Sequence, residues 1–239
     1  MIDLTRIVLI RDGVKLINDE SAADQPGGRK YDSSGRLARA AESRRLVVAV
    51  AHELFVREGY GPTSVSQIAH AAAVSVPTVY AGFGSKAEIL KVAIDVALAG
   101  DDEPVPLDKR PRAQYVFAAS TGAELLTRYA GLMGELAKRA APICHVLLLA
   151  SDTEPALAAL QADLERQRLV GATRVATAVR HLGALPEGRT VQEVRDLVWL
   201  YADPEIYVNL CVKRRWSTSR YVAWARHSLQ AIIEPSTGG

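Results

Sequence analysis

Several side chains between residues 64 and 86 are of types that bind nucleic acids. Ser64, Tyr80 and Lys86 can contact phosphate oxygens through hydroxyl and ammonium groups. A short helix is predicted over Val76–Ala81, and its first residues, Val76, Pro77 and Thr78, have small or apolar side chains. Such groups can touch a thymine methyl group, and the threonine hydroxyl can bond to a base edge. The chemistry that these residues suggest is recognition of a double helix.

Catalytic and metal-binding patterns are missing from the sequence. The chain has five histidines, which are His52, His70, His145, His181 and His227. None is paired with a His, Cys, Asp or Glu at a recognised metal spacing, and the adjacent pair Cys144-His145 would point to different faces of a helix. There is also no nucleophile elbow, phosphate-binding loop or dinucleotide fingerprint. We therefore expect neither an enzyme nor a bound metal or cofactor.

The charge of the chain argues for a local contact with nucleic acid rather than a global one. The formal net charge is only +2. Between residues 29 and 45, however, six basic residues face only two acidic ones, a local excess of +4. The basic residues are Arg29, Lys30, Arg36, Arg39, Arg44 and Arg45. Such an arm could follow the phosphate backbone or enter a minor groove, or it could be a solvated tail.

Cysteine usage and hydropathy indicate a cytoplasmic protein. The two cysteines, Cys144 and Cys211, are far apart in sequence, which fits a reducing compartment better than a disulfide framework. The longest apolar stretches fall far short of the ~20 residues that a membrane span needs. We expect no secretory signal, because Arg6 and Arg11 interrupt the apolar run Ile7–Ile10, which is too short for the apolar region of such a signal. We therefore expect no membrane partner.

The first 42 residues differ from the rest. Ile7–Ile10 and Val14–Ile17 flank an Asp-Gly pair and could form a weak hairpin. The polar stretch Asp19–Arg36 has the composition of a linker. Residues 1–42 are therefore predicted to be a leader or basic arm, alternatively a disordered segment or translation from an upstream start.

Helical signals begin at Arg36 and end a first time at Glu58-Gly59. Ser64 then starts a second helix, because Gln67 completes a capping box with it. Ser75 can cap a third, short helix over Val76–Ala81, and Ser85 a fourth over Lys86–Ala99. Two short helices joined by a tight turn, with a helix packed across them, form a helix-turn-helix unit. We place this unit at Ser64–Gly82, within a domain of residues 43–100.

The second half is predicted to be helical throughout, so the fold class is all-α. Three prolines and several charges mark Asp101–Pro111 as the domain boundary, and residues 101–239 form the second domain. The predicted helices are Arg112–Ala119, Gly122–Ala140, Pro142–Ser151, Glu154–Gly183, Thr190–Ala202, Pro204–Trp216 and Ser217–Ile233. The breaks between them fall at prolines and glycines.

Residues 43–90 resemble the TetR (tetracycline repressor) family. The resemblance rests on Thr63-Ser64-Val65-Ser66-Gln67-Ile68-Ala69 and on the run Val74–Lys86, with its Val-Ser-x-x-Thr-x-Tyr-x-x-Phe-x-Ser-Lys pattern. It implies an all-α homodimer with an N-terminal three-helix DNA-binding domain and a C-terminal domain that dimerises and binds a small-molecule inducer. It also implies DNA contacts at Ser64, Ser66, Val76, Pro77, Thr78, Tyr80 and Lys86.

The sequence departs from the family pattern at two places. Ala73 stands where the family usually has glycine, and a positive φ there would cost alanine on the order of 1 kcal/mol. Many helix-turn-helix units avoid that geometry, so the assignment stands. Val76 and Ala81-Gly82 stand where charged or aromatic residues are common, which leaves few groups for base readout. Sequence preference should therefore depend also on Ser66, the basic arm and DNA shape.

The C-terminal half carries the ligand and dimer predictions. Candidates for a pocket are Tyr129, Met133, His145, Leu148, Val175 and Trp199, each of which could equally be core. By resemblance to a subset of these regulators, Thr190–Tyr201 and Ser217–Ile233 would form the dimer surface. The prediction is a repressor that an inducer releases from a double-stranded DNA operator. Two alternatives are a DNA-binding protein of this fold without small-molecule input, and an all-α enzyme or scaffold whose helix-turn-helix is only structural.

Overall fold

The computed structural model describes residues 33–234. The described part contains helices and no strand, which confirms the predicted all-α class. The proposed hairpin at residues 7–17 and most of the proposed linker lie outside the described residues.

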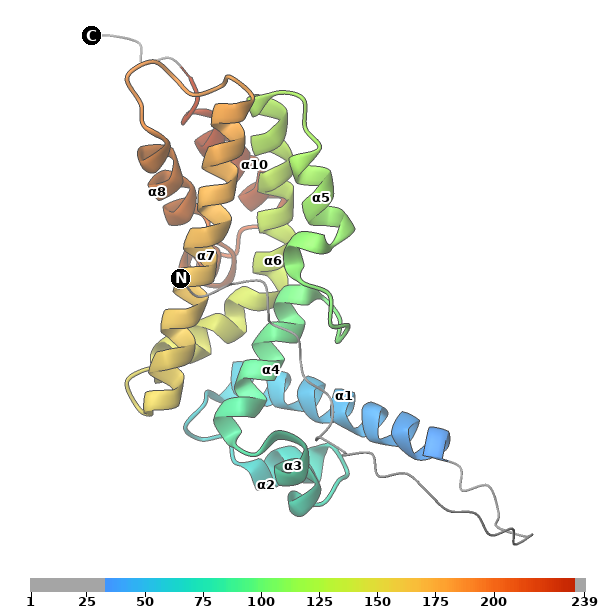
Figure 1. Ribbon diagram of the computed structural model, residues 1–239. Coiled ribbons are helices and arrows are strands. Elements are labelled where there is room, and N and C mark those ends of the chain that lie inside the picture. The colour runs from blue at the N-terminus through green and yellow to red at the C-terminus, as the bar shows by residue number, and fades with distance from the viewer. Residues whose placement is uncertain (1–32, 235–239) are drawn as a thin grey trace, which may run out of the picture.

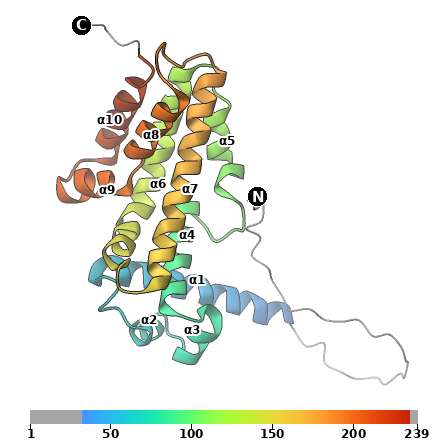
Figure 2. The same ribbon diagram turned by 60° about the vertical axis from the view of Figure 1, so that its left-hand side comes forward.

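Four helices form the N-terminal domain. They are α1 (Ser33–Glu58), α2 (Val65–Ala71), α3 (Val76–Phe83) and α4 (Lys86–Ala99). Helix α1 lies across α2 and α3, and its first half extends beyond them (Figures 1 and 2). Its start at Ser33 corrects one expectation, since Ser33–Arg36, the last four residues of the predicted linker, are helical, and residue 43, the predicted start of the domain, lies inside this helix.

Serine caps define the starts of α2, α3 and α4 as expected. Ser64 accepts a hydrogen bond from the Gln67 N–H, and the Gln67 side chain accepts one from the Ser64 N–H, which completes the capping box. Ser75 and Ser85 cap the next two helices in the same way, through the N–H groups of Thr78 and Glu88. These local bonds satisfy backbone donors that a helix start leaves free.

The turn between α2 and α3 adopts the geometry that its sequence was expected to avoid. Ala73 has a φ of 53°, in the left-handed region. Its N–H donates to the His70 carbonyl, and the next N–H, of Val74, donates to the Ala69 carbonyl. These bonds end α2 as a helix usually ends at a glycine, so alanine carries strain here.

We expect Ala73→Gly to stabilise the domain by about 1 kcal/mol, because glycine adopts this conformation without the Cβ clash. Thermal and urea denaturation of the two proteins would measure the difference. Ala71→Gly, two residues earlier within α2, is the control and should instead destabilise by roughly 0.5–1 kcal/mol. Equal stability of wild type and Ala73→Gly would contradict the strain argument.

The C-terminal domain is built around two long helices, α6 (Gly122–Ala150) and α7 (Pro155–His181). The other elements pack around them and are η1 (Leu107–Lys109), α5 (Pro111–Phe117), α8 (Val191–Tyr201), α9 (Pro204–Tyr207), the π-helical η2 (Val208–Lys213) and α10 (Thr218–Gln230). The predicted helix Pro204–Trp216 is thus divided between α9 and η2.

Pro142 does not break the helix that contains it. The sequence predicts a boundary between Ala140 and Pro142, but α6 continues through both. Ala141 and Ile143, on either side of the proline, are fully buried. Burial of these neighbours offsets the hydrogen bond that proline cannot make. The second half of α6 turns away from the axis of the first half (Figure 1).

One hydrophobic core joins the N-terminal domain to the ends of α6 and α7. It includes Phe55 of α1 and Leu90 of α4 together with Leu147 of α6 and Leu157 of α7. A second core fills the space between α6, α7, α8 and α10. Helix α4 therefore belongs to the N-terminal domain and also packs on α6 of the C-terminal one.

Candidate nucleic-acid interface and cavity

Helices α2 and α3 expose a set of predicted contact residues at one end of the molecule (Figure 1). The side chains of Ser66, Pro77, Thr78 and Tyr80 are exposed, and Tyr80 is 51% exposed. The Tyr80 hydroxyl makes no hydrogen bond to another described residue, so it is free to donate to a phosphate. This exposed surface has the composition that the sequence predicts for DNA contact.

Three of the predicted contact residues also serve the fold. Ser64 is exposed, but its hydroxyl lies 2.8 Å from the Gln67 side-chain oxygen in the capping box. Val76 is partly buried against the hydrophobic core, so it is less available to a base. The Thr78 hydroxyl lies 2.7 Å from that of Ser75 and can still turn to a partner outside the protein.

Lys86 holds the loop between α1 and α2 to the start of α4. Its ammonium group donates to the carbonyls of Tyr60 and Thr63, at 3.0 and 3.1 Å, and lies 4.1 Å from the centre of the Tyr60 ring. An ammonium group has three N–H donors, so one remains for a phosphate. The sequence suggested a phosphate contact but not this structural role.

Arg44 and Arg45, the last two basic residues of the arm predicted to contact DNA, have partners inside the protein. Arg44 donates to the Gly82 carbonyl at 2.8 Å and stacks over the Phe83 ring. It therefore ties α1 to the end of α3. Arg45 donates to the Asp102 carboxylate at 2.7 Å and ties α1 to the loop after α4. Both side chains are exposed, so these are surface contacts that a phosphate could exchange or share.

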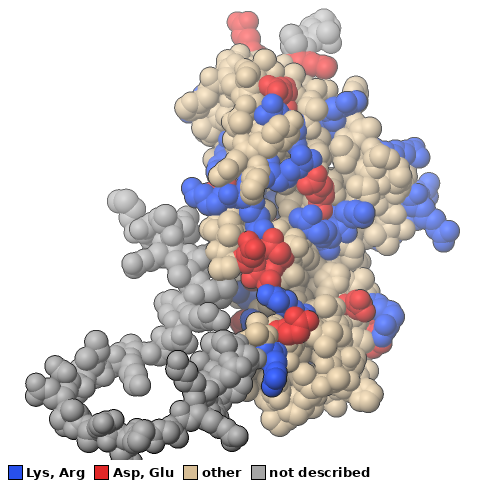
Figure 3. All heavy atoms as spheres, turned by 90° about the vertical axis from the view of Figure 1, so that its right-hand side faces the viewer, with Lys and Arg blue, Asp and Glu red and all other residues tan. Residues whose placement is uncertain are grey.

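The charge near α2 and α3 is low for a nucleic-acid surface. Residues 43–100 carry five basic and four acidic side chains. On the face shown in Figure 3, the lower end of the molecule has few Lys and Arg side chains, and more of them lie over the C-terminal domain. Hydroxyl groups and close contact, rather than a strong field, must supply much of any affinity at α3.

A cavity of about 550 Å³ lies within the C-terminal domain. Helices α5, α6 and α7 and the segment Ala202–Glu205 form most of its wall, and Leu98 of α4 completes it. Four of the predicted pocket residues line it, namely Tyr129, Met133, Leu148 and Val175. His145 and Trp199 are not among the lining residues, but each contacts one that is: His145 contacts Glu205, and Trp199 stacks on Arg168.

Sequence reasoning missed the charged residues of this wall. Arg168 donates to Glu165 at 2.8 Å and to the Trp199 carbonyl at 3.1 Å, and its guanidinium lies 3.2 Å from Asp203. A Glu205 carboxylate oxygen lies 2.7 Å from the His145 Nδ1 atom. The i, i+3 spacing of Glu165 and Arg168 was a visible signal for a helix ion pair, but it says nothing about a cavity.

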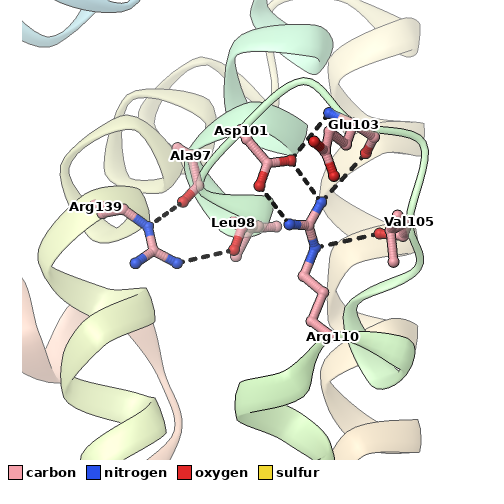
Figure 4. A network of polar contacts seen from close by, with 7 residues as sticks. All are labelled: Ala97, Leu98, Asp101, Glu103, Val105, Arg110 and Arg139. Atoms are coloured by element: carbon pink, nitrogen blue, oxygen red, sulfur yellow. Dashed lines mark hydrogen bonds and ion pairs between the residues drawn. The ribbon is translucent and has the colours of Figure 1, made fainter.

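A further set of contacts connects the two domains near Gly100 (Figure 4). Arg110 forms two hydrogen bonds to the Asp101 carboxylate, at 2.6 and 2.8 Å, and lowers the pKa of that carboxyl group. Arg139 of α6 donates to the carbonyls of Ala97 and Leu98, at 3.0 and 3.2 Å. These two carbonyls are among the last of α4, where a helix favours cations.

Within residues 33–234, no group of three or more His, Cys, Asp or Glu side chains is placed to hold a metal ion. No helix in that part of the chain combines the length and the apolar character that crossing a membrane requires.

Comparison with known proteins agrees with the interpretation of α2 and α3 as a helix-turn-helix unit. Residues 47–93 match the family model for bacterial regulatory proteins of the tetR family. This segment, from the middle of α1 to the middle of α4, is similar to the bacterial regulatory proteins of that family. This match confirms the predicted resemblance, and since the family is one of regulatory proteins, it agrees with the expectation that the chain is not an enzyme. No curated protein sequence matches the chain.

Solved structures share the tetR-type fold over most of the chain. The fatty acid degradation regulator FadR from Bacillus halodurans superimposes with a TM-score of 0.62 at 16% identity, covering 82% of this chain and 97% of FadR. The TetR-family regulator PfmR from Thermus thermophilus gives 0.54 at 22% identity, covering 82% and 97%. A protein from Syntrophomonas wolfei assigned to the TetR family gives 0.64 at 14% identity, covering 81% and 95%. Fold and family together support a DNA-binding regulator of transcription.

Proposed function

We propose that this protein is a cytoplasmic repressor that binds a palindromic operator as a homodimer and releases it when a small molecule fills the cavity. The observation that carries the proposal is the position of Leu98. It lies in the last turn of α4 and in the cavity wall, while the first turn of α4 follows directly after α3. One helix thus reaches from the cavity wall to the unit proposed to contact DNA.

Arg139 strengthens this connection. Its bonds to Ala97 and Leu98 attach the end of α4 to α6, which supplies much of the cavity wall (Figure 4). A ligand that shifts α6 would therefore shift the end of α4. Release of DNA requires only that the ligand bind the shifted state more tightly than the DNA-bound one.

The dimer in this proposal forms through α8 and α10. The two helices are neighbours at one edge of the C-terminal domain (Figure 2). Leu200 of α8 is 49% exposed although it is a large apolar side chain. A two-fold dimer would present two copies of α3 to successive major grooves, which a single weakly charged unit could not do tightly.

The test begins with genome-wide mapping of bound DNA, which should yield a palindrome. Fluorescence anisotropy on that duplex then serves to screen small molecules for release of the protein. Ala137→Trp fills the cavity from α6, and Ala123→Trp adds the same side chain at an exposed position of the same helix.

Compounds that release the wild type should also release Ala123→Trp but lose at least about tenfold in potency on Ala137→Trp, because the indole occupies their site. If no palindrome were bound anywhere in the genome, the proposal that this protein is a repressor would be overturned. Equal release of all three proteins would show that the compounds do not act through this cavity.

A further inference from the structure

We propose that the ligand of this cavity is an amphipathic cation, with a hydrophobic body and a protonated amine that lies against Glu205. This inference rests on the proposed function only in that the ligand would act as the inducer. Binding of the ligand to the cavity can be measured without DNA. The inference follows from the walls of the cavity, its charge balance and two side-chain oxygens, one of Glu205 and one of Tyr129, that make no hydrogen bond within residues 33–234.

The long walls of the cavity require an apolar ligand body. They consist mainly of aliphatic side chains from α6 and α7, among them Leu132, Met133, Leu136, Ala140, Leu164 and Val175. The charged side chains that α7 adds to these walls, Glu165, Arg168 and Arg174, are each paired with an opposite charge. A ligand that fills the cavity gains free energy by removing apolar surface from water.

One end of the cavity carries an excess of negative charge. Glu165, Asp203 and Glu205 line it, and Arg168 is the cation among them. Arg168 pairs with both Glu165 and Asp203, so one guanidinium serves two carboxylates. His145 contacts Glu205, and even a protonated His145 would leave the group with one negative charge in excess.

Nearby charges affect the pKa values of Cys144 and Tyr129, two other residues of the cavity wall. Burial and, to a smaller extent, the nearby Glu205 carboxylate raise the pKa of the Cys144 thiol to about 12, while Arg168 opposes both effects. Arg168 also opposes the effect of burial on the Tyr129 hydroxyl, whose pKa is raised to about 12. Cys144 therefore lies near both Glu205 and Arg168, and Tyr129 lies near Arg168.

Two polar groups at this end have unused bonding capacity. One Glu205 oxygen contacts His145, while the other makes no hydrogen bond to a described residue. The Tyr129 hydroxyl lines the cavity and likewise makes none within residues 33–234. An ammonium group can donate to both oxygens, and the Tyr129 ring offers it a favourable face.

An anionic headgroup would not find a comparable site. Arg168 already has two carboxylate partners, and Arg174, another cation of the lining, pairs with Asp108 at 3.2 Å. A ligand carboxylate would have to displace one of these partners and would face the remaining negative charge. The charge balance therefore selects against acids that have the same hydrophobic body.

Three matched probes test the inference: 4-phenylbutylamine, 4-phenylbutan-1-ol and 4-phenylbutanoate. They share one apolar body and differ in the charge of the headgroup at pH 7. Isothermal titration calorimetry on the full chain should show the amine binding at least about tenfold more tightly than the carboxylate, with the alcohol between them. Glu205→Gln should reduce the preference of the amine over the alcohol at least about fivefold, because the amide retains the shape and loses the charge.

Glu187→Gln is the matched control, because Glu187 is an exposed residue in the loop before α8 and does not line the cavity. It should leave all three affinities unchanged. Equal or tighter binding of the carboxylate, failure of all three probes to bind, or an unchanged amine preference in Glu205→Gln would each overturn the inference.

The same titrations separate this inference from the repressor proposal. An amine that binds with the expected selectivity but leaves the operator complex intact would uphold the ligand class and contradict the proposed induction. If a compound of another class released the operator and no amine bound, the proposed induction would be upheld and the ligand class would be contradicted.

Discussion

Thr78→Glu should reduce operator affinity by at least about 100-fold while leaving the protein folded. Thr78 is exposed in the first turn of α3, where the proposed interface meets DNA. A carboxylate at that point would face phosphates, and such like-charge contacts cost several kcal/mol, of which about 1.4 kcal/mol corresponds to each tenfold loss. Anisotropy with the operator duplex measures the affinity, and thermal denaturation measures the stability.

The fold should tolerate this substitution because of the cap of α3. Ser75 is the N-cap, and position 78 is the third helical residue. Glutamate there can complete a capping box with Ser75, as Gln67 does with Ser64. A carboxylate in the first turn of a helix is also favoured by the helix dipole.

Thr78→Gln is the matched control, since it can form the same cap without the charge. Its affinity should fall by no more than about tenfold, the value of one lost hydrogen bond to a base or phosphate. Operator binding by Thr78→Glu at the wild-type level would show that the first turn of α3 does not face DNA.

The starts of α2, α3 and α4 could be predicted because local bonds set them. Ser64, Ser75 and Ser85 each accept a hydrogen bond from an N–H three residues later, and sequence spacing alone reveals this. The tetR-type pattern extends over the same segment, so the predicted fold and the exposed residues of α3 agree with the structure. Residues within one helical turn of each start were sufficient to predict where α2, α3 and α4 begin.

Properties that depend on residues distant in sequence could not be predicted in the same way. Burial on both sides carries α6 through Pro142, and the bonded turn after α2 holds Ala73 at positive φ. The partners of Lys86 and Arg45, at positions 60, 63 and 102, become neighbours only after folding. The sequence therefore suggested that Lys86 and Arg45 contact phosphates and gave no sign of their partners within the protein.

The cavity shows the same division. Apolar candidates such as Met133 and Val175 line it because helical periodicity already points them inward. Its charged end joins α7 to the α8–α9 junction, where Arg168 pairs with Asp203, 35 positions later in the sequence. No local pattern links these residues, so the chemistry of the ligand could be inferred only from the structure.

Gly134→Ala should destabilise the C-terminal domain by about 2 kcal/mol, within the usual range for an overpacked core. Gly134 is buried where α6 crosses α10, and a Cβ there would lie 2.3 Å from the Val222 Cγ2 atom. Valine is stiff in a helix and cannot rotate away at low cost. For a chain of this size the melting temperature should fall by roughly 4–8 °C, measurable by calorimetry.

A double-mutant cycle with Val222→Ala isolates the clash. Val222→Ala removes the methyl group that the new Cβ would meet, so adding Gly134→Ala to it should cost less than about 0.5 kcal/mol, and the coupling should approach 2 kcal/mol. Gly171→Ala is the control on α7, because a Cβ there meets nothing within 4 Å. It should stabilise the helix by about 0.5–1 kcal/mol, since alanine restricts the unfolded chain more than glycine does. Equal costs of Gly134→Ala in the presence and absence of Val222 would show that the contact of α6 with α10 does not depend on this glycine.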